Sequence, residues 1–237
     1  MFCRVSDLKG RTVRARDGDV GSVEDVYFDD EHLAVRYLVV KTGTWLRQRR
    51  VLVSPRAVHA WPTEGVVEVD VTREQVEHSP PIESDEPVSR RYEKAYADYY
   101  RQPYYWNGPN LWGIGAYPAP WPGEAFEYGG RWDAAERSAA EDEALQAEVR
   151  EAEECHLRSA NEVMGYHVVA RDGEVGEIDD LLVDPKDWSV RELVVDTRLW
   201  WPGGHVSVPA DALESIDWSS SRAGIKLDRA TVRGRGT

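Results

Sequence analysis

Few side chains of this chain have the types and spacing that catalysis or metal binding requires. Its six histidines, at positions 32, 59, 78, 156, 167 and 205, show no spacing typical of zinc ligands. The run Glu153-Glu154-Cys155-His156 contains metal-binding residue types, but consecutive residues of a helix point in different directions and cannot chelate as one face. We therefore expect no metal site and no cofactor.

A second set of possible ligands consists of carboxylates that recur at corresponding places in the chain: Asp25, Asp29, Asp30 and Glu31, then Asp180, Asp184 and Asp187. Such groups could bind a cation, but turns favour Asp for its local hydrogen bonds, so turn formation is a sufficient explanation. Weak cation binding stays open. No nucleophile, base and oxyanion-binding groups come together in the pattern, so we predict no catalytic residues and no enzymatic activity.

The sequence contains two copies of one module. Residues 8–29 realign with residues 163–184 at a constant offset of 155, and the offset persists where 35–42 meets 190–197. An internal repeat of this length indicates two domains of the same fold. We expect repeat 1 at residues 1–78 and repeat 2 at residues 159–237.

Each repeat has the pattern of a small antiparallel β-domain. Asp17-Gly18 and Asp172-Gly173 lie between strand-like runs, which favours a tight hairpin. Apolar runs such as Leu38-Val39-Val40 then predict buried strands. Recurrent glycines at 10, 21, 165 and 176 are best explained by backbone demands such as a helix end and a strand bend.

Short helices are predicted from capping boxes. Thr72-Arg73-Glu74-Gln75 indicates a last helix in repeat 1, and Ser159-Ala160-Asn161-Glu162 indicates one that opens repeat 2. Strands are expected at 20–28, 51–53 and 66–69, and at 206–208 and 225–227 in repeat 2.

The segment between the repeats has a different composition. Of the 24 aromatic residues of the chain, 13 lie between Tyr92 and Trp132, interspersed with prolines that oppose helix and central strand. We expect an irregular, extended linker at 79–132. It is either a flexible tether or an adhesive segment that packs on a repeat or on a partner. Residues 133–158 have the pattern of an acidic, mostly solvated helix.

Composition limits the possible partners and the compartment. The chain carries 29 Lys and Arg against 43 Asp and Glu, a net charge of -14, which argues against nucleic acid as the main partner. Two isolated cysteines, Cys3 and Cys155, suggest a reducing compartment. No apolar run resembles a signal peptide or a membrane span. We expect a soluble cytoplasmic protein, with peripheral recruitment to a membrane left open.

Both repeats resemble PRC-barrel domains, the module of the reaction-centre H subunit that also occurs in the ribosome-maturation factor RimM. The residues that carry the resemblance are the opening Gly10 or Gly165, the Asp-Gly turn, the following Val-Gly pair, and the runs at 36–42 and 191–197. The resemblance implies a mainly β fold of two small antiparallel barrels, used for protein contact and without established catalytic residues. It does not explain the linker.

The repeats differ most in one loop, which we predict to be the partner-binding part of each. Leu46-Arg47-Gln48-Arg49-Arg50 in repeat 1 stands against Trp201-Pro202-Gly203-Gly204-His205 in repeat 2. The candidate binding residues are Trp45, Arg47, Arg49, Arg50, Trp200, Trp201 and His205.

Three functions fit these observations. The first is a non-enzymatic adaptor or scaffold that binds proteins, with self-association or pairing of its own repeats as further possibilities. The second, implied by the resemblance, is an accessory protein of a photosynthetic or other electron-transfer complex. The third is a ribosome-assembly factor, although RimM-like proteins have a different domain before a single PRC barrel.

Overall fold

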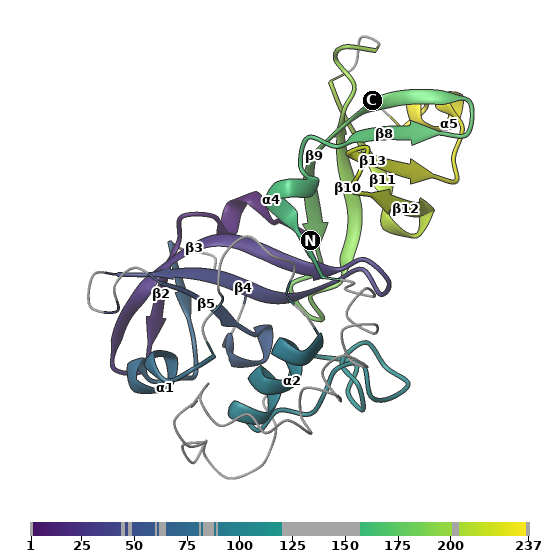
Figure 1. Ribbon diagram of the computed structural model, residues 1–237. Coiled ribbons are helices and arrows are strands. Elements are labelled where there is room, and N and C mark those ends of the chain that lie inside the picture. Colours follow the sequence, from purple (N-terminus) through teal and green to yellow (C-terminus); the bar gives the residue numbers. More distant parts are fainter. Residues whose placement is uncertain are drawn as a thin grey trace. The chain divides into compact units, whose positions relative to one another are not determined.

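The computed structural model shows a mainly β protein with two sheets (Figure 1). The structure describes residues 2–43, 46, 49–59, 61, 65–80, 82, 88, 90–119, 157–200 and 204–235. Most of the predicted acidic helix lies outside these residues, at 133–156. Its predicted last two residues, 157 and 158, instead begin a short strand, β7 (Leu157–Ser159).

The sheet of repeat 1 has the strand order β5-β4-β3-β2-β6, and β7 pairs with β3 beside this path. Its strands alternate in direction except for β2 and β6, which are parallel. Their bounds are β2 (Thr12–Ala15), β3 (Gly18–Asp29), β4 (Ala34–Thr42), β5 (Arg50–Val53) and β6 (Val66–Glu68).

The sheet of repeat 2 follows the same plan, with the order β11-β10-β9-β8-β13-β12, and β1 (Cys3–Arg4) pairs with β9. Here β8 and β13 form the parallel pair. The bounds are β8 (His167–Ala170), β9 (Gly173–Val183), β10 (Val190–Asp196), β11 (His205–Pro209), β12 (Leu213–Asp217) and β13 (Arg222–Ile225).

The hairpins occur where the Asp-Gly signals predict them. Ala15 is paired with Gly18, and Ala170 with Gly173. Two expectations need correction. The sheets are not purely antiparallel, because β6 in repeat 1 and β13 in repeat 2 return beside the first strand of the hairpin in the parallel sense. Strand β12 was also missed, since Leu213–Asp217 lacks a continuous apolar run. The two sheets are established, whereas their closure into barrels stays a prediction.

Gly21 and Gly176 allow close approach of neighbouring strands. A Cβ on Gly21 would lie 2.0 Å from the carbonyl oxygen of Lys41, and a Cβ on Gly176 would lie 2.3 Å from that of Asp196. Any side chain at these positions would push β4 or β10 away. The predicted backbone role of these two glycines is confirmed.

Short helices adjoin the sheets. Helix α1 (Arg73–Glu77) has the predicted capping box, in which Thr72 Oγ1 accepts from the Gln75 amide and the Gln75 side chain accepts from the Thr72 amide. The other helical turns are η1 (Ser6–Leu8), η3 (Pro55–Ala57), α4 (Ala160–Val163), η4 (Ala210–Ala212) and α5 (Arg229–Arg233).

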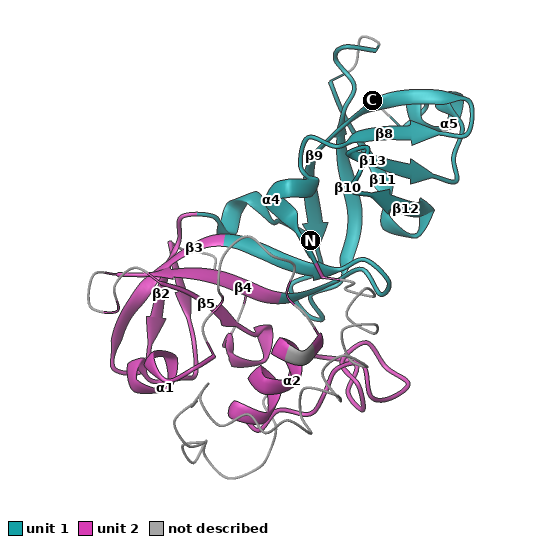
Figure 2. Cartoon of the chain, in the orientation of Figure 1, with its two compact units in different colours: residues 1–9, 25–36, 158–237 teal, residues 10–24, 37–157 magenta. Residues whose placement is uncertain are grey.

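The chain divides into two compact units that do not follow the order of the repeats (Figure 2). Unit 1 contains residues 1–9, 25–36 and 158–237, and unit 2 contains residues 10–24 and 37–157. Unit 1 thus combines repeat 2 with two segments of repeat 1: the entry segment and the turn end of the β3–β4 hairpin. The boundaries predicted at 78, 132 and 158 stay predictions.

A helix that the sequence analysis missed lies in the aromatic linker. Helix α2 (Arg90–Tyr99) belongs to a stretch without proline or glycine, and its apolar contacts come from tyrosines spaced three or four residues apart. The expectation of an irregular linker was therefore wrong for these residues, because the prolines that oppose a helix are confined to positions outside them.

The tyrosines of α2 pack on the sheet of repeat 1 within unit 2. The ring of Tyr96 meets that of Tyr37 edge to face with centroids 5.1 Å apart, and its hydroxyl accepts from the Ser54 amide at 2.9 Å. The Tyr99 hydroxyl donates to the carbonyl of Gln75 at 2.7 Å. Because these side chains are engaged in the interior, residues 90–100 are a docked segment rather than a free tether.

The chain after α2 is also attached. Glu93, buried in α2, accepts from the Tyr105 hydroxyl at 2.7 Å and pairs with Arg90 at 3.0 Å. Arg56 of η3 donates to the carbonyl of Trp112 at 2.7 Å and lies over its ring. Trp112 is 1 % exposed, so this aromatic residue forms part of the core of unit 2.

Repeat 2 is polar at two positions where repeat 1 has buried apolar side chains, one of which, Tyr37, contacts α2. Where repeat 1 has Tyr37 and Leu52, the offset of 155 places Glu192 and Ser207. Leu52 is fully buried, whereas Ser207 is exposed. One repeat is therefore built to be covered by the linker and the other is not.

Replacing Tyr96 by Ala should lower the free energy of unfolding by about 3–5 kcal/mol, because it removes a fully buried ring and leaves the Ser54 amide without its acceptor. Urea unfolding measures the change. Tyr117→Ala, at a tyrosine that is 58 % exposed, is the control and should cost less than about 1 kcal/mol. Equal losses in the two variants would contradict the docking of α2.

Candidate functional site

The predicted binding residues of repeat 1 that the structure describes are Arg49 and Arg50, and both have contacts inside unit 2. Arg49, the residue before β5, donates to the carbonyls of Val76 and Ser79 at 3.0 and 2.9 Å. These hydrogen bonds join the start of β5 to the end of α1. Arg50 pairs with Glu24 at 2.5 Å. Trp45 and Arg47 lie outside the described residues. A partner-binding role for these four residues stays a prediction.

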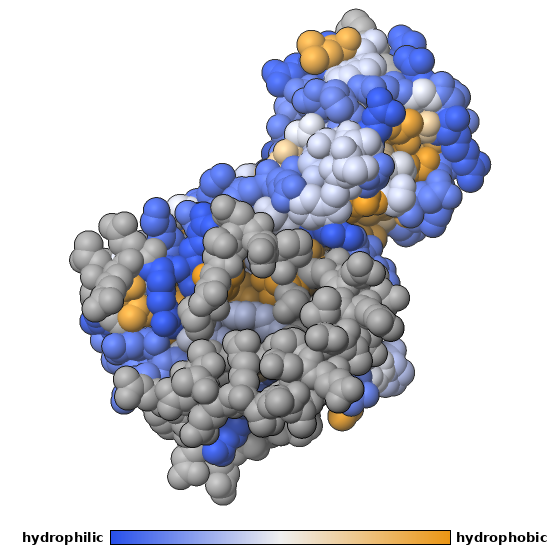
Figure 3. All heavy atoms as spheres, in the orientation of Figure 1, coloured by the Kyte–Doolittle hydropathy of each residue, from blue (hydrophilic) through white to orange (hydrophobic). Residues whose placement is uncertain are grey.

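In repeat 2 the loop between β10 and β11 carries one exposed apolar side chain among its described residues, Leu199. Thr197 closes its base, with its amide and hydroxyl both donating to the Gly204 carbonyl. Leu199 is 84 % exposed, the largest value among the exposed large apolar residues of the described chain. Figure 3 shows apolar atoms at the tip of this hairpin, set apart from the largely hydrophilic surface of unit 1.

Trp200 follows Leu199 and is partly buried, with its ring in edge contact with His167 at a centroid distance of 6.4 Å. Trp201 lies outside the described residues. Leu199 was missed by the sequence analysis, which singled out the tryptophans. The sequence did contain a sign of this exposure. A leucine beside two tryptophans in a loop rich in Gly and Pro lies outside the strands, whose alternation buries apolar side chains.

The outer face of the same sheet carries a row of ionisable residues. His167, Glu177, Asp196 and His205 lie in register on β8, β9, β10 and β11, because each is the paired neighbour of the next. Their strand neighbours Val168, Ile178, Val195 and Val206 are buried, so the row faces away from the core.

The two histidines of the row lie close to carboxylates of β9. His167 Nδ1 is 2.8 Å from Glu174 Oε1, and His205 Nε2 is 3.4 Å from Asp179 Oδ2. Asp196 accepts hydrogen bonds from the side chain and the backbone amide of Arg198, which lower its pKa to about 2. Glu177 and Asp196, two acidic residues, lie directly opposite each other. We name the group His167, Glu174, Glu177, Asp179, Asp196 and His205 the acidic face.

Two aspartates considered as cation ligands instead hold the entry segments of the opposite repeats. Asp180 of β9 is 1 % exposed and accepts from the amide and the hydroxyl of Ser6, at 3.2 and 2.5 Å. Asp25 of β3 accepts from the Ser159 hydroxyl and the Asn161 amide, at 2.5 and 3.1 Å. Burial raises the pKa of Asp25, and these hydrogen bonds oppose the increase. All of these contacts lie within unit 1.

The remaining carboxylates of this set have turn or ion-pair roles. Asp184 accepts from the Lys186 amide and Asp187 from the Ser189 amide, as the turn explanation predicts. Asp30, by contrast, pairs with Arg158 at 2.5 Å.

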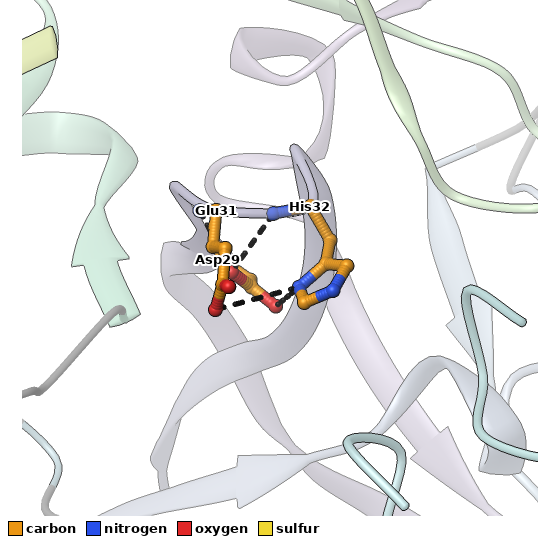
Figure 4. A group of neighbouring side chains, drawn as sticks. All are labelled: Asp29, Glu31 and His32. Atoms are coloured by element: carbon orange, nitrogen blue, oxygen red, sulfur yellow. Dashed lines mark hydrogen bonds and ion pairs between the residues drawn. The ribbon is translucent and has the colours of Figure 1, made fainter. Parts of the chain in front are cut away.

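Asp29, Glu31 and His32 lie at the β3–β4 turn with one side-chain ligand atom of each within 4.8 Å of the others (Figure 4). The Asp29 carboxylate already accepts from the amides of Glu31 and His32 and pairs with the buried Arg36 at 3.0 Å. Burial alone would raise the pKa of Asp29, but Arg36 and the hydrogen bonds outweigh it and the net pKa is lowered. These contacts explain the group as a turn held by a buried ion pair.

The two matching sheets define the chain as a duplicated β-module. A family model described as PRC-barrel domain matches residues 2–76 and 156–226, which together form more than half of the chain. The chain belongs to the PRC-barrel family, with two copies of the domain, as the resemblance predicted. Among curated proteins no match is found.

None of the helices in the described part of the chain has the length and apolar character to cross a membrane.

Replacing Asp180 by Ala should lower the free energy of unfolding by roughly 2–4 kcal/mol, because the Ser6 amide and hydroxyl lose a buried charged acceptor. Urea unfolding followed by circular dichroism measures it. Asp179→Ala, on the neighbouring residue with a side chain that is 37 % exposed, should cost less than about 1 kcal/mol. A small loss for both would contradict the role of Asp180.

Stability should depend on the ionisation of Asp29. Because folding lowers the pKa of this carboxyl, its contribution is present above the unfolded-state value of 3.8 and is lost as the pH falls through the folded-state pKa. The free energy of unfolding of Asp29→Asn should therefore fall less than that of the wild type when urea titrations are moved from pH 6 to pH 3. An equally steep acid loss in the variant would refute this assignment.

Proposed function

We propose that this protein is a non-enzymatic adaptor that binds another protein through the β10–β11 hairpin tip of repeat 2. The observation that supports it is the 84 % exposure of Leu199 at the end of a hairpin whose base is closed by hydrogen bonds. An isolated exposed apolar residue needs no explanation, but Leu199 is followed in the chain by Trp200, Trp201 and Pro202, which form a short apolar segment.

Leucine and tryptophan at a protruding tip suit protein contact for a physical reason. Aromatic side chains supply a large contact area at a small entropy cost, and binding energy concentrates on a few such residues. The closed base fixes the direction of the tip, so little conformational entropy is lost when a partner covers it.

The two repeats support a division of roles. In repeat 1 Tyr37 is covered by Tyr96 of the docked α2 segment, whereas repeat 2 carries the exposed tip. We place the binding activity in repeat 2 and a structural role in the linker of repeat 1. The absence of catalysis and a cytoplasmic location are parts of the same proposal.

Leu199→Asp should reduce partner capture by about ten-fold or more, because a desolvated carboxylate would replace an apolar contact at the centre of the interface. The full chain, immobilised from cells that produce it, is used to recover partners for quantitative mass spectrometry, and light scattering records self-association. Trp200→Ala is a second variant that should act in the same direction.

Ile114→Asp is the matched control, since Ile114 is an apolar residue of unit 2 that is 69 % exposed. It should recover the same partners as the wild type. The proposal fails if Leu199→Asp and Ile114→Asp recover equal amounts of every partner and leave self-association unchanged.

A further inference from the structure

The acidic face adjoins the proposed binding tip and is built from the same strands. Asp196 ends β10 and His205 begins β11, so these two residues lie at the base of the hairpin that carries Leu199. His167, at the other end of the row, is in contact with Trp200. The tip and the face are therefore continuous.

The fold does not require acidic residues on this face. At the offset of 155, the row His167, Glu177, Asp196 and His205 corresponds to Thr12, Ser22, Lys41 and Arg50 in repeat 1. Those residues occupy the same strand positions, with Thr12 paired to Ser22 and Lys41 to Arg50. The same sheet plan thus accepts neutral and basic residues in this row.

The arrangement is also unfavourable for the isolated sheet. Glu177 lies opposite Asp196, and like charges at directly opposed positions of neighbouring strands are destabilising. The cations nearby compensate in part: Arg198 is bound to Asp196, Arg4 lies 3.5 Å from the Asp179 carboxylate, and Arg222 lies beside His167 on β13. The carboxylates on β9 have side chains that are 32 to 39 % exposed, so they are accessible from solvent.

We propose that the acidic face and the Leu199 tip form one docking surface for a protein segment in which lysine or arginine flanks an apolar side chain. This rests on the proposed function and specifies the chemistry of its partner. The apolar residue of the partner contacts Leu199 and Trp200, and its cations meet Glu177 and Asp179. Complementary charge of this kind determines partner choice and the rate of association more than it determines total affinity.

The test transplants two residues of repeat 1 into the row. Glu177→Ser with Asp196→Lys makes repeat 2 resemble repeat 1 at these positions, which the fold tolerates there. The probe is a short fluorescein-labelled peptide of lysine and leucine, and its affinity for the full chain is measured by fluorescence anisotropy. The double variant should weaken binding by about ten-fold or more at low salt, and the difference should shrink as salt is added.

Asp211→Lys with Glu214→Ser is the matched control. Both residues are exposed, both lie in repeat 2 outside the acidic face, and the pair changes the net charge by the same amount. It should bind the peptide nearly as tightly as the wild type. Equal weakening by the two double variants would overturn the proposal, because the peptide would then respond to overall charge alone.

The other outcomes separate this proposal from the proposed function. If Leu199→Asp abolishes partner capture while the acidic-face variant captures every partner at the wild-type level, the tip binds proteins and the basic chemistry is wrong. If neither variant affects capture, both proposals fail. A wild-type chain that dimerises, and loses the dimer in the acidic-face variant, would overturn the assignment to a separate partner. The variant should remain folded by circular dichroism, with a lower urea midpoint than the wild type because Asp196→Lys removes the acceptor of Arg198.

Discussion

Two aspartates, Asp25 and Asp180, determine how the entry segments of the two repeats are held. Strands β1 and β7 have only two and three residues, too few to remain paired by ladder hydrogen bonds alone. Asp180 accepts hydrogen bonds from Ser6, which follows β1, and Asp25 accepts them from Ser159 at the end of β7 and from Asn161 after it. Each repeat thus supplies a strand that pairs with a strand of the other, and a carboxylate secures each exchange.

The duplicated fold has acquired different surfaces in its two copies. Repeat 1 carries apolar residues where α2 docks, and its row of outer residues is neutral or basic. Repeat 2 has polar residues at the docking positions, an acidic row and an exposed leucine. Because the buried valines of the sheet are retained in both copies, this divergence is confined to positions that the core does not constrain.

Much of the fold could be predicted from local patterns. The Asp-Gly hairpins, the buried runs and the capping box of α1 depend on neighbouring residues, so a single sequence contains the required information. Helix α2 was missed because the composition of the whole linker obscured a proline-free stretch around Tyr96. The parallel return strand and the entry-segment exchange depend on contacts between distant positions, such as Ser6 with Asp180, which no local pattern records.

The candidate site was predicted in part. The hairpin loop was selected because it differs between the repeats, and that difference drew attention to Trp200 and His205. Leu199 was not singled out, and the row formed with Glu177 could not be recognised, since its four members come from four strands separated by loops. Only the strand register brings them together.

The exchanged entry strands also have an evolutionary consequence. Once each copy of a duplicated gene segment supplies a strand to the other, loss of either copy leaves the remaining one with an unpaired strand edge and an orphaned carboxylate. Deletion of one repeat, or recombination between the two, is then disfavoured, so selection retains the tandem arrangement. The docked part of the segment between them is constrained in a different way, because Tyr96 and Trp112 are buried in unit 2.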